Sequence, residues 1–474
     1  MTQARIVVGR RRTVVLYALC VIAAPLALST LGLEGGQVLA TAGFCMILFG
    51  AIFFWRQRLT FAFAGVALLL ATDLLDVEHL IEFAGLEIIL FLAATMLIIG
   101  FLEENQFFEV LIERLLALVG PHPVQIMGVL MLTAAVAAAL VGEVTSILFM
   151  IAALLNLLGR SRVNPVPFVL MLVLATNIGS SATAVGNPVG VIIALESGLT
   201  FVDFLRWATP ISLICLGLAI PICLHLFRDD IDGLKHVLTG TRGERRIEHV
   251  AAEEQIPRGG FRRSAILFSA VIVGLVLHHP LEEMLGLEPN TMLLGVALLG
   301  AAAALAMSGG RAREMFEERV DWWTLGFFML LFASVGTLGQ QGVTEVIAQR
   351  LIALSDGNLP LLTTIFAWAA GLLTAFMDNV LAVATFVPII EDAGDAGIST
   401  FPLWWATLFG GTLMGNATLI GSTANIVAVG ALERRGLGEI TFMQWLRPGL
   451  LVAIPTMVVA NVLLLIQLPL MPDT

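Results

Sequence analysis

Apolar stretches of close to 20 residues recur along almost the whole chain, with short polar loops between them. A helix of that length crosses the roughly 30 Å of hydrocarbon in a bilayer. The pattern therefore predicts an all-α membrane protein with about 11 transmembrane spans. The predicted spans cover residues 13–33, 37–55, 59–76, 85–102, 166–197, 207–227, 264–280, 289–308, 322–340, 401–433 and 448–469.

Two further apolar segments carry a single acid near their centres, Glu143 in residues 124–158 and Asp378 in residues 361–390. A carboxylate at the bilayer centre costs roughly 2.5–3.5 kcal/mol, so a functional role is the default interpretation. Each acid also passes directly into an apolar run, unlike a surface turn. We predict two re-entrant hairpins, 121–159 and 358–391, with tips near the membrane midplane. In the alternative, each segment forms two full spans and its acid lies in an exposed turn.

The chain contains an internal repeat. Gly142–Val144 recurs as Asp378–Val380 at an offset of 236 residues, and Ala182–Asn187 recurs as Ala417–Ser422 at an offset of 235. Two more matches join these: Glu109, Arg114 and Ala117 recur as Glu345, Arg350 and Ala353, and Thr200 and Arg206 recur as Thr441 and Arg447. Polar residues repeat along with apolar ones, which favours a functional over a purely structural duplication.

Arginine is concentrated in alternate loops, which predicts the orientation of the spans. The loops expected in the cytoplasm hold Arg5, Arg10, Arg11, Arg12, Arg56, Arg58, Arg160, Arg162, Arg311, Arg313, Arg319, Arg434 and Arg435. This places the N-terminus inside and the C-terminus outside the inner (plasma) membrane. Arg114 then lies inside and its counterpart Arg350 outside, so the two repeats are inverted. Inverted repeats bind substrate near the midplane, where broken helices of the two copies meet.

The predicted organisation follows from these features. Residues 1–36 form an extra N-terminal span, 37–227 the first repeat, 228–263 a polar cytoplasmic linker and 264–470 the second repeat.

Polar residues interrupt one span in each repeat, 166–197 in the first and 401–433 in the second. The interruptions cover residues 176–188 and 411–425, which are rich in Gly, Ser, Thr and Asn. Unwound backbone at membrane depth is tolerated only inside protein or beside a wet cavity. Freed oxygens suit a dehydrated cation, and half-helix N-termini suit an anion. Small-residue packing between helices is the alternative.

Composition excludes several classes of function. The chain is 58% apolar and 13% charged, whereas soluble domains are about a quarter charged. The four cysteines lie in apolar stretches without a CxxC pair, and the seven histidines form no metal-spaced cluster. We find no nucleophile–base arrangement and no Walker A motif, so we expect no enzyme activity, no cofactor beyond a coupling ion and no nucleic-acid partner. The hairpin tips and breaks also hold no Arg, Lys or His, so bound cations would have to offset the charge of an anion.

The residues that carry a family resemblance are Gly-Asn-Ala-Thr-Leu-Ile-Gly-Ser-Thr-Ala-Asn at 415–425, Asp378–Val380, and the stretch from Val163–Phe168 through Pro188. They resemble the ion transporter superfamily, which includes the divalent anion/sodium symporters, arsenite permeases, NhaD-type antiporters, the P protein and citrate-transporter-like domains. The resemblance implies a homodimer in which a transport part moves as an elevator against a scaffold part. Neither hairpin tip carries the Ser-Asn-Thr of the symporters.

The resemblance also implies the site residues. They are Glu143, Val144, Thr145, Asn177, Ser180, Thr183, Gly186 and Asn187 in the first half, and Asp378, Asn379, Asn416, Thr418, Ser422 and Asn425 in the second. Na⁺ is expected at Glu143, Asn187, Asp378, Asn379 and Asn425.

The sequence thus favours a secondary active transporter of a small ion, and a small organic or inorganic anion coupled to Na⁺ or H⁺ is the first hypothesis. A Na⁺/H⁺ antiporter is the second, because a buried carboxylate can alternate between a proton and sodium. Proton-coupled efflux of arsenite or a similar oxyanion is the third. The expected partners are the small ion, the lipid bilayer and a second copy of the chain.

Overall fold

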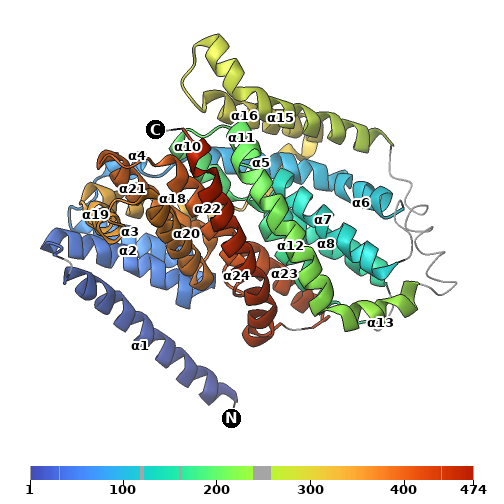
Figure 1. The fold of residues 1–474 in the computed structure, drawn as a ribbon, viewed down its shortest axis with the longest axis horizontal. Coiled ribbons are helices and arrows are strands. Elements are labelled where there is room, and N and C mark those ends of the chain that lie inside the picture. The colour runs from blue at the N-terminus through green and yellow to red at the C-terminus, as the bar shows by residue number, and fades with distance from the viewer. Residues whose placement is uncertain are drawn as a thin grey trace.

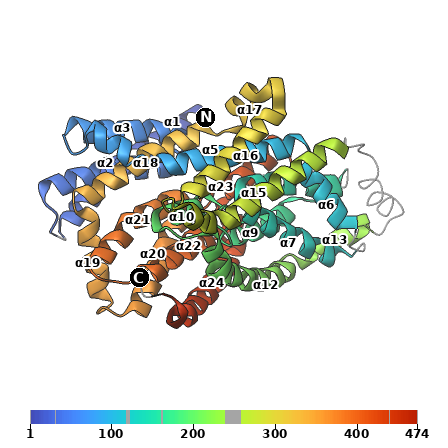
Figure 2. The same ribbon diagram turned by 90° about the horizontal axis from the view of Figure 1, so that it is seen from above.

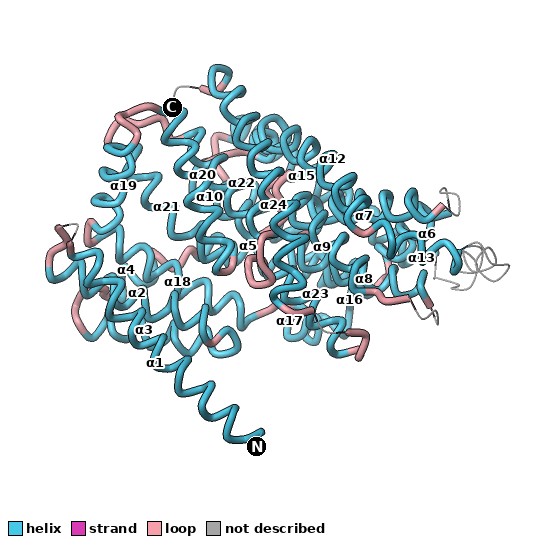
Figure 3. Tube along the Cα trace, turned by 60° about the horizontal axis from the view of Figure 1, so that its bottom comes forward, coloured by secondary structure: helices cyan, strands magenta, loops and turns pink. Residues whose placement is uncertain are grey.

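The computed structural model describes residues 2–30, 32–117, 122–159, 163–238, 258–438 and 440–472, and these are arranged as helices joined by loops (Figures 1 and 3). The described residues contain no strand. The prediction of an all-α membrane protein is confirmed. Residue 121, Arg160, Arg162 and linker residues 239–257 lie outside the described residues.

Nine helical segments in the described part of the chain are long and apolar enough to cross a membrane. They are Gly35–Phe53, Val77–Glu104, Pro123–Val141, Phe201–Leu226, Gly260–Leu285, Thr291–Arg319, Trp322–Gln340, Leu359–Phe376 and Phe442–Leu470. The first arm of each predicted hairpin is among the nine, so re-entry from one side and the number of spans stay predictions.

One group of helices forms a scaffold along one side of the molecule (Figure 2). Its members are α1 (Thr2–Ser29), α2 (Gly35–Phe53), α3 (Arg58–Ala71), α5 (Leu86–Glu104), α15 (Arg258–Leu285), α16 (Thr291–Ser308), α17 (Ala312–Arg319) and α18 (Trp322–Gln340). The first and second halves both contribute to it, because α18 packs on α2, α3 and α5. α1 contacts the rest of the molecule mainly through α2, and its apolar portion, Arg12–Ala27, is shorter than the predicted span.

A second group forms an inner bundle beside the scaffold. From the first half come α7 (Pro123–Val141), α8 (Glu143–Leu158), α9 (Val166–Ser180), α10 (Pro188–Ser197) and α12 (Thr209–Leu226). From the second half come α20 (Leu359–Phe376), α21 (Asn379–Asp395), α22 (Phe401–Leu413), α23 (Thr423–Arg434) and α24 (Phe442–Gln467). The connecting helices are α4 (Val77–Glu82), α6 (Phe107–Ala117), α11 (Phe201–Asp203), α13 (Arg228–Leu238) and α19 (Val343–Leu354).

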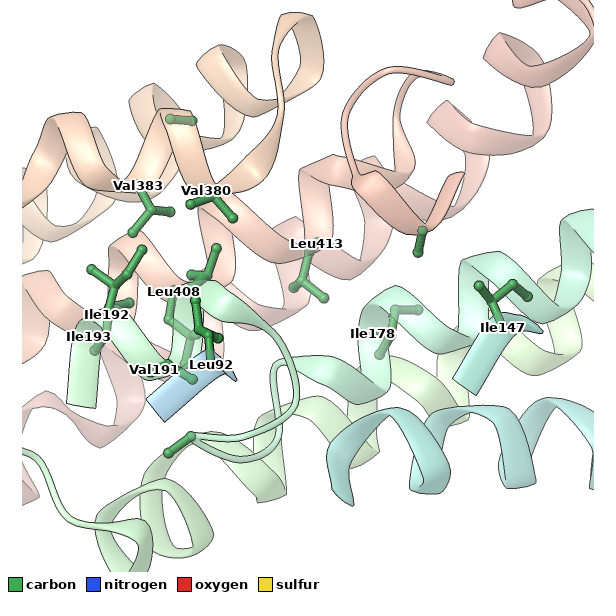
Figure 4. Packing of buried hydrophobic residues seen from close by; sticks show 14 of the residues in the cluster. Leu92, Ile147, Ile178, Val191, Ile192, Ile193, Val380, Val383, Leu408 and Leu413 are labelled. Atoms are coloured by element: carbon green, nitrogen blue, oxygen red, sulfur yellow. The ribbon is translucent and has the colours of Figure 1, made fainter. Parts of the chain in front are cut away.

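The two halves exchange their half-helices. α10 of the first half packs on α21 and α22 of the second, and α23 of the second packs on α8 and α9 of the first. In Figure 4, Ile192 and Ile193 of α10 lie beside Val383 of α21 and Leu408 of α22. Because these side chains are apolar and buried, their contact stabilises the packing of α10 against the second hairpin.

Both interrupted spans are broken, as predicted, and each break contains a glycine that permits a close backbone approach. A Cβ at Gly186 would stand 2.1 Å from the Ser180 carbonyl oxygen, and one at Gly421 would stand 2.7 Å from that of Gly415. These pairs occupy equivalent positions at the repeat offset of 235, so the chain turns back on itself in the same way in both halves.

The breaks are shorter than the polar stretches. α9 runs to Ser180 and α22 to Leu413, so the prediction of an interruption that begins at residues 176 and 411 is wrong. Polar side chains near the helix ends bond to carbonyl groups one turn back, Ser180 Oγ to Asn177 and Thr412 Oγ1 to Leu408. The hydroxyl groups of Ser180 and Thr412 are therefore hydrogen-bonded while both residues remain helical.

The polar linker predicted at 228–263 is partly helical. Arg228–Leu238 form α13, which packs on α7, and α15 begins at Arg258 rather than near residue 264.

Candidate ion-binding site

The first hairpin turns at Gly142, between α7 and α8. Gly142 has φ +90° and ψ 151°, a backbone conformation that is essentially restricted to glycine. This sharp turn places Glu143 at the first position of α8, where its side chain is 2% exposed. The carboxylate therefore lies inside the protein.

The second hairpin turns at Met377 and Asp378, between α20 and α21. Asp378 caps α21 by accepting a hydrogen bond from the Val380 amide at 3.1 Å, and it is 4% exposed. Burial at both tips excludes the alternative in which the two acids lie in exposed turns.

The Glu143 carboxylate joins the two halves of the protein. One oxygen, Oε2, accepts from Ser180 Oγ at 3.1 Å. The other, Oε1, accepts from Asn379 Nδ2 at 3.3 Å and from Ser422 Oγ at 3.1 Å. Glu143 and Asn379 are equivalent at the repeat offset of 236, so corresponding residues of the two tips bond to each other. The donors that surround this buried carboxylate are neutral.

Three asparagines extend the network beside Glu143. Asn177 Nδ2 donates to Asn416 Oδ1 and to Asn425 Oδ1, both at 2.8 Å, and its Oδ1 accepts from Ser422 at 3.2 Å. Asn425 Nδ2 donates to the carbonyl groups of Gly415 and Thr418. The amides thus hold the unwound second break against α9 of the first half and orient its oxygens.

Capping residues repeat at the two breaks. Asn187 accepts from the Gly190 amide at the start of α10, and Ser422 accepts from the Ala424 amide at the start of α23. Asn187 Nδ2 also donates to Ser180 Oγ at 2.9 Å, which connects it to Glu143. The partial positive charge at each half-helix start therefore faces the network.

Two threonines attach the breaks to the hairpin arms. Thr183 Oγ1 donates to the Ala139 carbonyl, and Thr418 Oγ1 donates to the Ala375 carbonyl at 2.6 Å. Gly186 permits the close turn described above. These three predicted site residues shape the backbone and do not touch the carboxylates.

Asp378 has a different environment from Glu143. Its Oδ2 accepts from Thr423 Oγ1 at 2.6 Å, and it lines a small cavity together with Trp55, the scaffold ring on which Arg58 stacks. The sequence analysis missed Arg58 and assigned it to a cytoplasmic loop. Because Arg58 lies more than 300 residues from Asp378 in the chain and outside every repeat match, no sequence signal could have paired them.

Small cavities lie where the tips meet the scaffold. One, of about 120 Å³, separates the first tip from α5 and α15 and is lined by Glu143, Val144, Thr145 and Asn187 among apolar side chains. A second, of about 40 Å³, lies between Trp55 and the second tip and is lined by Asp378. Val144 and Thr145 thus face the first cavity, outside the hydrogen-bond network.

A wider cleft, of about 560 Å³, lies between α4, α10, α18 and α21. It is rich in acids, including Glu82, Glu87, Glu196, Glu391, Asp392 and Asp395. Such a surface concentrates cations near the inner bundle.

The network brings together eight of the predicted site residues: Glu143, Asn177, Ser180, Asn187, Asn379, Asn416, Ser422 and Asn425. Of the five residues predicted for Na⁺, only Glu143 and Asn379 are in direct contact. Groups of three or more His, Cys, Asp or Glu side chains that could hold a metal are absent from the described residues. Carboxylate, amide and hydroxyl oxygens are nevertheless ligands that suit a hard cation.

Comparison with known proteins gives consistent results. A family model described as CitMHS, citrate transporter, matches residues 44–410. An uncharacterized transporter of Mycobacterium tuberculosis (strain H37Rv) is 30% identical over 384 residues, which cover 80% of this chain and 85% of that protein. An uncharacterized transporter of Synechocystis sp. is 28% identical over 425 residues, which cover 84% of this chain and 90% of that protein.

Two more distant proteins are also similar, one in sequence and one in structure. The human P protein is 25% identical over 468 residues, which cover 84% of this chain and 55% of that longer protein. The crystal structure of the Alcanivorax borkumensis YdaH transporter superposes with a TM-score of 0.54 at 15% identity, covering 86% of this chain and 89% of that one. At that identity the likeness concerns the fold alone. The predicted relation to the ion transporter superfamily is confirmed.

Proposed function

The chain belongs to the CitMHS family of membrane transporters, and on that premise we propose that it is a secondary active transporter that moves a small organic or inorganic anion coupled to Na⁺ or H⁺. Its inner bundle would carry the ion as an elevator against the scaffold. The family match shows a multi-pass membrane transporter. The substrate class, the coupling ion and the elevator motion are what we propose.

The buried carboxylate of Glu143 carries this proposal. It accepts hydrogen bonds from Ser180, Asn379 and Ser422, which come from both halves and are all neutral. A buried charge without a counter-charge is costly, so such a carboxylate favours a bound cation or proton. Release of that cation would loosen contacts between both halves at once, which is what coupling to transport requires.

The half-helix ends support an anionic substrate. α10 and α23 begin at Asn187 and Ser422, beside Glu143, and helix N-termini favour negative charge. Arg, Lys and His are absent from the hydrogen bonds of the network among the described residues, so a bound cation would supply the positive charge that an anion needs. This arrangement favours symport, in which cation and anion bind next to each other.

The cavities beside the tips support relative motion of bundle and scaffold. The scaffold walls of the two cavities, formed by α5 and α15 at the first tip and by α2 at the second, are apolar apart from a few groups. Apolar, imperfectly filled contacts slide more readily than hydrogen-bonded ones because no polar group has to exchange partners.

Reconstituted vesicles provide the test. Uptake of citrate, other carboxylates, phosphate and arsenite should be measured with a sodium gradient and a pH gradient imposed separately. We expect one gradient to drive uptake of one anion, and Glu143→Gln to abolish that dependence. Glu283→Gln is the control, because Glu283 is exposed and lies outside both the network and the acidic cleft.

The same vesicles separate the two alternatives. Sodium-dependent proton flux without any added anion would replace the proposal with the Na⁺/H⁺ antiporter. Proton-driven export of arsenite alone would replace it with oxyanion efflux. Absence of gradient-driven flux for every ion would contradict transport of this class.

We further propose a homodimer in the inner membrane with a cytoplasmic N-terminus, on the basis of the arginine distribution and the family resemblance. A membrane-impermeant thiol reagent should label Asp356→Cys from outside intact cells and leave Arg313→Cys unlabelled. The reverse result would overturn the orientation. Cross-linking in native membranes should give a species of twice the monomer mass.

A further inference from the structure

The second hairpin tip shares a small cavity with Trp55, the scaffold ring on which Arg58 stacks. Arg58 begins α3 of the scaffold and is 7% exposed, although it was expected in a cytoplasmic loop. Through this ring and cavity the guanidinium is near Asp378, across the boundary between scaffold and bundle. A second carboxylate near Arg58 is that of Asp321, which accepts a hydrogen bond from Thr324.

Scaffold residues hold the Arg58 guanidinium in place. It stacks on the Trp55 ring at 3.9 Å from the centroid and lies 5.4 Å from that of Phe327. One terminal nitrogen donates to Thr324 Oγ1 at 2.6 Å, and Thr324 donates in turn to Asp321 at 2.5 Å. Nε is buried and has no hydrogen-bond partner among the described residues. The cation is thus fixed in position but only partly satisfied by its own neighbours.

We propose that Arg58 is the permanent counter-charge of Asp378, so that Glu143 alone, and not Asp378, takes the coupling cation. This inference rests on the proposed function and deepens it by assigning the cation to one of the two acids. Arg58 is therefore a positioning residue that acts through Asp378. The two carboxylates, which the sequence presents as a matched pair, have separate roles.

Electrostatics supports this assignment. Two opposite charges removed from water attract strongly, and a cation brought to Asp378 would also be repelled by Arg58. Glu143 has neutral donors around it and no such competitor. The cation that enters the protein therefore gains more by binding at Glu143.

Space supports it as well. The cavity next to Asp378 measures about 40 Å³ and is otherwise lined by apolar side chains such as Met377 and Ile420. That volume admits a water molecule but offers few oxygen ligands for a dehydrated ion. At Glu143 the hydroxyl oxygens of Ser180 and Ser422 each lie 3.1 Å from the carboxylate, and the adjoining cavity is about three times larger at 120 Å³.

Charge-pair rescue tests the proposal. The variants are Arg58→Gln, Asp378→Asn, the double variant Arg58→Gln/Asp378→Asn, Arg58→Lys and Glu143→Gln, all in the full-length chain. We expect at least a tenfold loss of uptake in Arg58→Gln, because it leaves the Asp378 charge unpaired. The double variant should recover most of that loss with an unchanged number of cations per anion. Arg58→Lys should recover it in part.

A second readout does not need transport. In detergent, added Na⁺, or a lowered pH if protons drive uptake, should raise the thermal midpoint of the wild type by ligand linkage. The same cation should still raise the midpoint of Asp378→Asn and of the double variant, but not that of Glu143→Gln. Asp378→Asn leaves Arg58 its hydrogen bond to Thr324 and the nearby Asp321 carboxylate, so it remains informative if Arg58→Gln fails to fold.

The outcomes are distinguishable. Loss of cation stabilisation in Asp378→Asn together with its retention in Glu143→Gln would overturn the inference and leave cation-coupled transport standing. A double variant no better than Arg58→Gln would also overturn it. A wild type that neither transports against an imposed gradient nor responds to either cation would instead overturn the proposed function.

Discussion

The two hairpin tips occupy equivalent places in the repeat but carry their acid at different positions. At the offset of 236, Gly142 corresponds to Asp378 and Glu143 to Asn379. The first-half acid therefore points into the network shared by both halves, whereas the second-half acid lies one residue earlier, beside Thr423 and the scaffold residue Arg58. A shift of one residue changes every partner of the carboxylate.

This difference shows how an inverted repeat becomes functionally asymmetric without a change of fold. Both halves have a glycine in the break, a capping side chain at the start of the half-helix, and a threonine that donates to a carbonyl group of the hairpin arm. The charges are not shared. Symmetry thus shapes the backbone of both tips, and the placement of single side chains gives the two carboxylates different surroundings.

Of the substitutions that compare the two tips, neutralisation of Glu143 should lower cation-driven uptake most. Glu143→Gln removes the carboxylate that would hold the coupling cation, so cation-driven uptake should fall at least about 100-fold, the equivalent of about 3 kcal/mol. Asp378→Asn should lower it less, because Arg58 then loses only one of its partners. Initial uptake rates in vesicles check this, and equal losses in both variants would remove the asymmetry.

A methyl group in the first break should have the next largest effect. Gly186→Ala places a Cβ 2.1 Å from the Ser180 carbonyl, and backbone on both sides cannot move apart easily. We expect a loss of about 3 kcal/mol or more in stability, seen as a lower thermal midpoint in detergent. Gly421→Ala should cost less, since its contact is 2.7 Å. Gly217→Ala, which meets no heavy atom within 4 Å, is the control.

Gly142→Ala tests the first tip alone. A side chain is strained at the φ of +90° that Gly142 adopts, so Gly142→Ala should lower the free energy of unfolding by about 1–3 kcal/mol. The added Cβ would not clash, because its nearest neighbour lies at 4.0 Å. Asp378→Ala removes the cap of α21 but should leave the tip backbone unstrained, because φ there is −58°. If Gly142→Ala were as stable as the wild type, the turn at the first tip would not depend on glycine.

Removal of single donors should have the smallest effects. Ser180→Ala and Ser422→Ala each remove one of the three hydrogen bonds to Glu143 and leave the other two, so each should cost about 1.5 kcal/mol, the lower end of the range for a charged acceptor. We expect about a tenfold weaker dependence on the coupling cation in each variant. Ser212→Ala, a buried serine outside the network, should leave that dependence unchanged. Cation titrations of uptake measure the effect, and no change in either network variant would argue against cation binding at Glu143.

The sequence predicted much of this arrangement because its strongest signals are local. Apolar length located most of the helices, and the polar glycine-rich stretches located both breaks to within a few residues. The family resemblance placed Glu143, Asn379 and Ser422 in one site, and the three side chains are hydrogen-bonded in the structure.

What the sequence did not predict depends on long-range packing. Arg58 pairs with a residue in the other repeat, and its burial follows from the way α3 packs on α18. Likewise, the exact ends of the breaks depend on hydroxyl groups bonding within a helix, and the polar pattern alone does not reveal this. The repeat match shows that the two acids are one residue out of register, but it does not show that this shift gives them different hydrogen-bond partners.

The central claim is that the two halves meet at Glu143 inside the membrane. Electron cryo-microscopy of the protein in lipid nanodiscs, with the coupling cation present, tests it most directly. The account predicts the Glu143 carboxylate about 15 Å from either headgroup layer, within hydrogen-bond distance of Asn379 and Ser422. A Glu143 at headgroup depth, or one separated from the second half by lipid or bulk water, would contradict it.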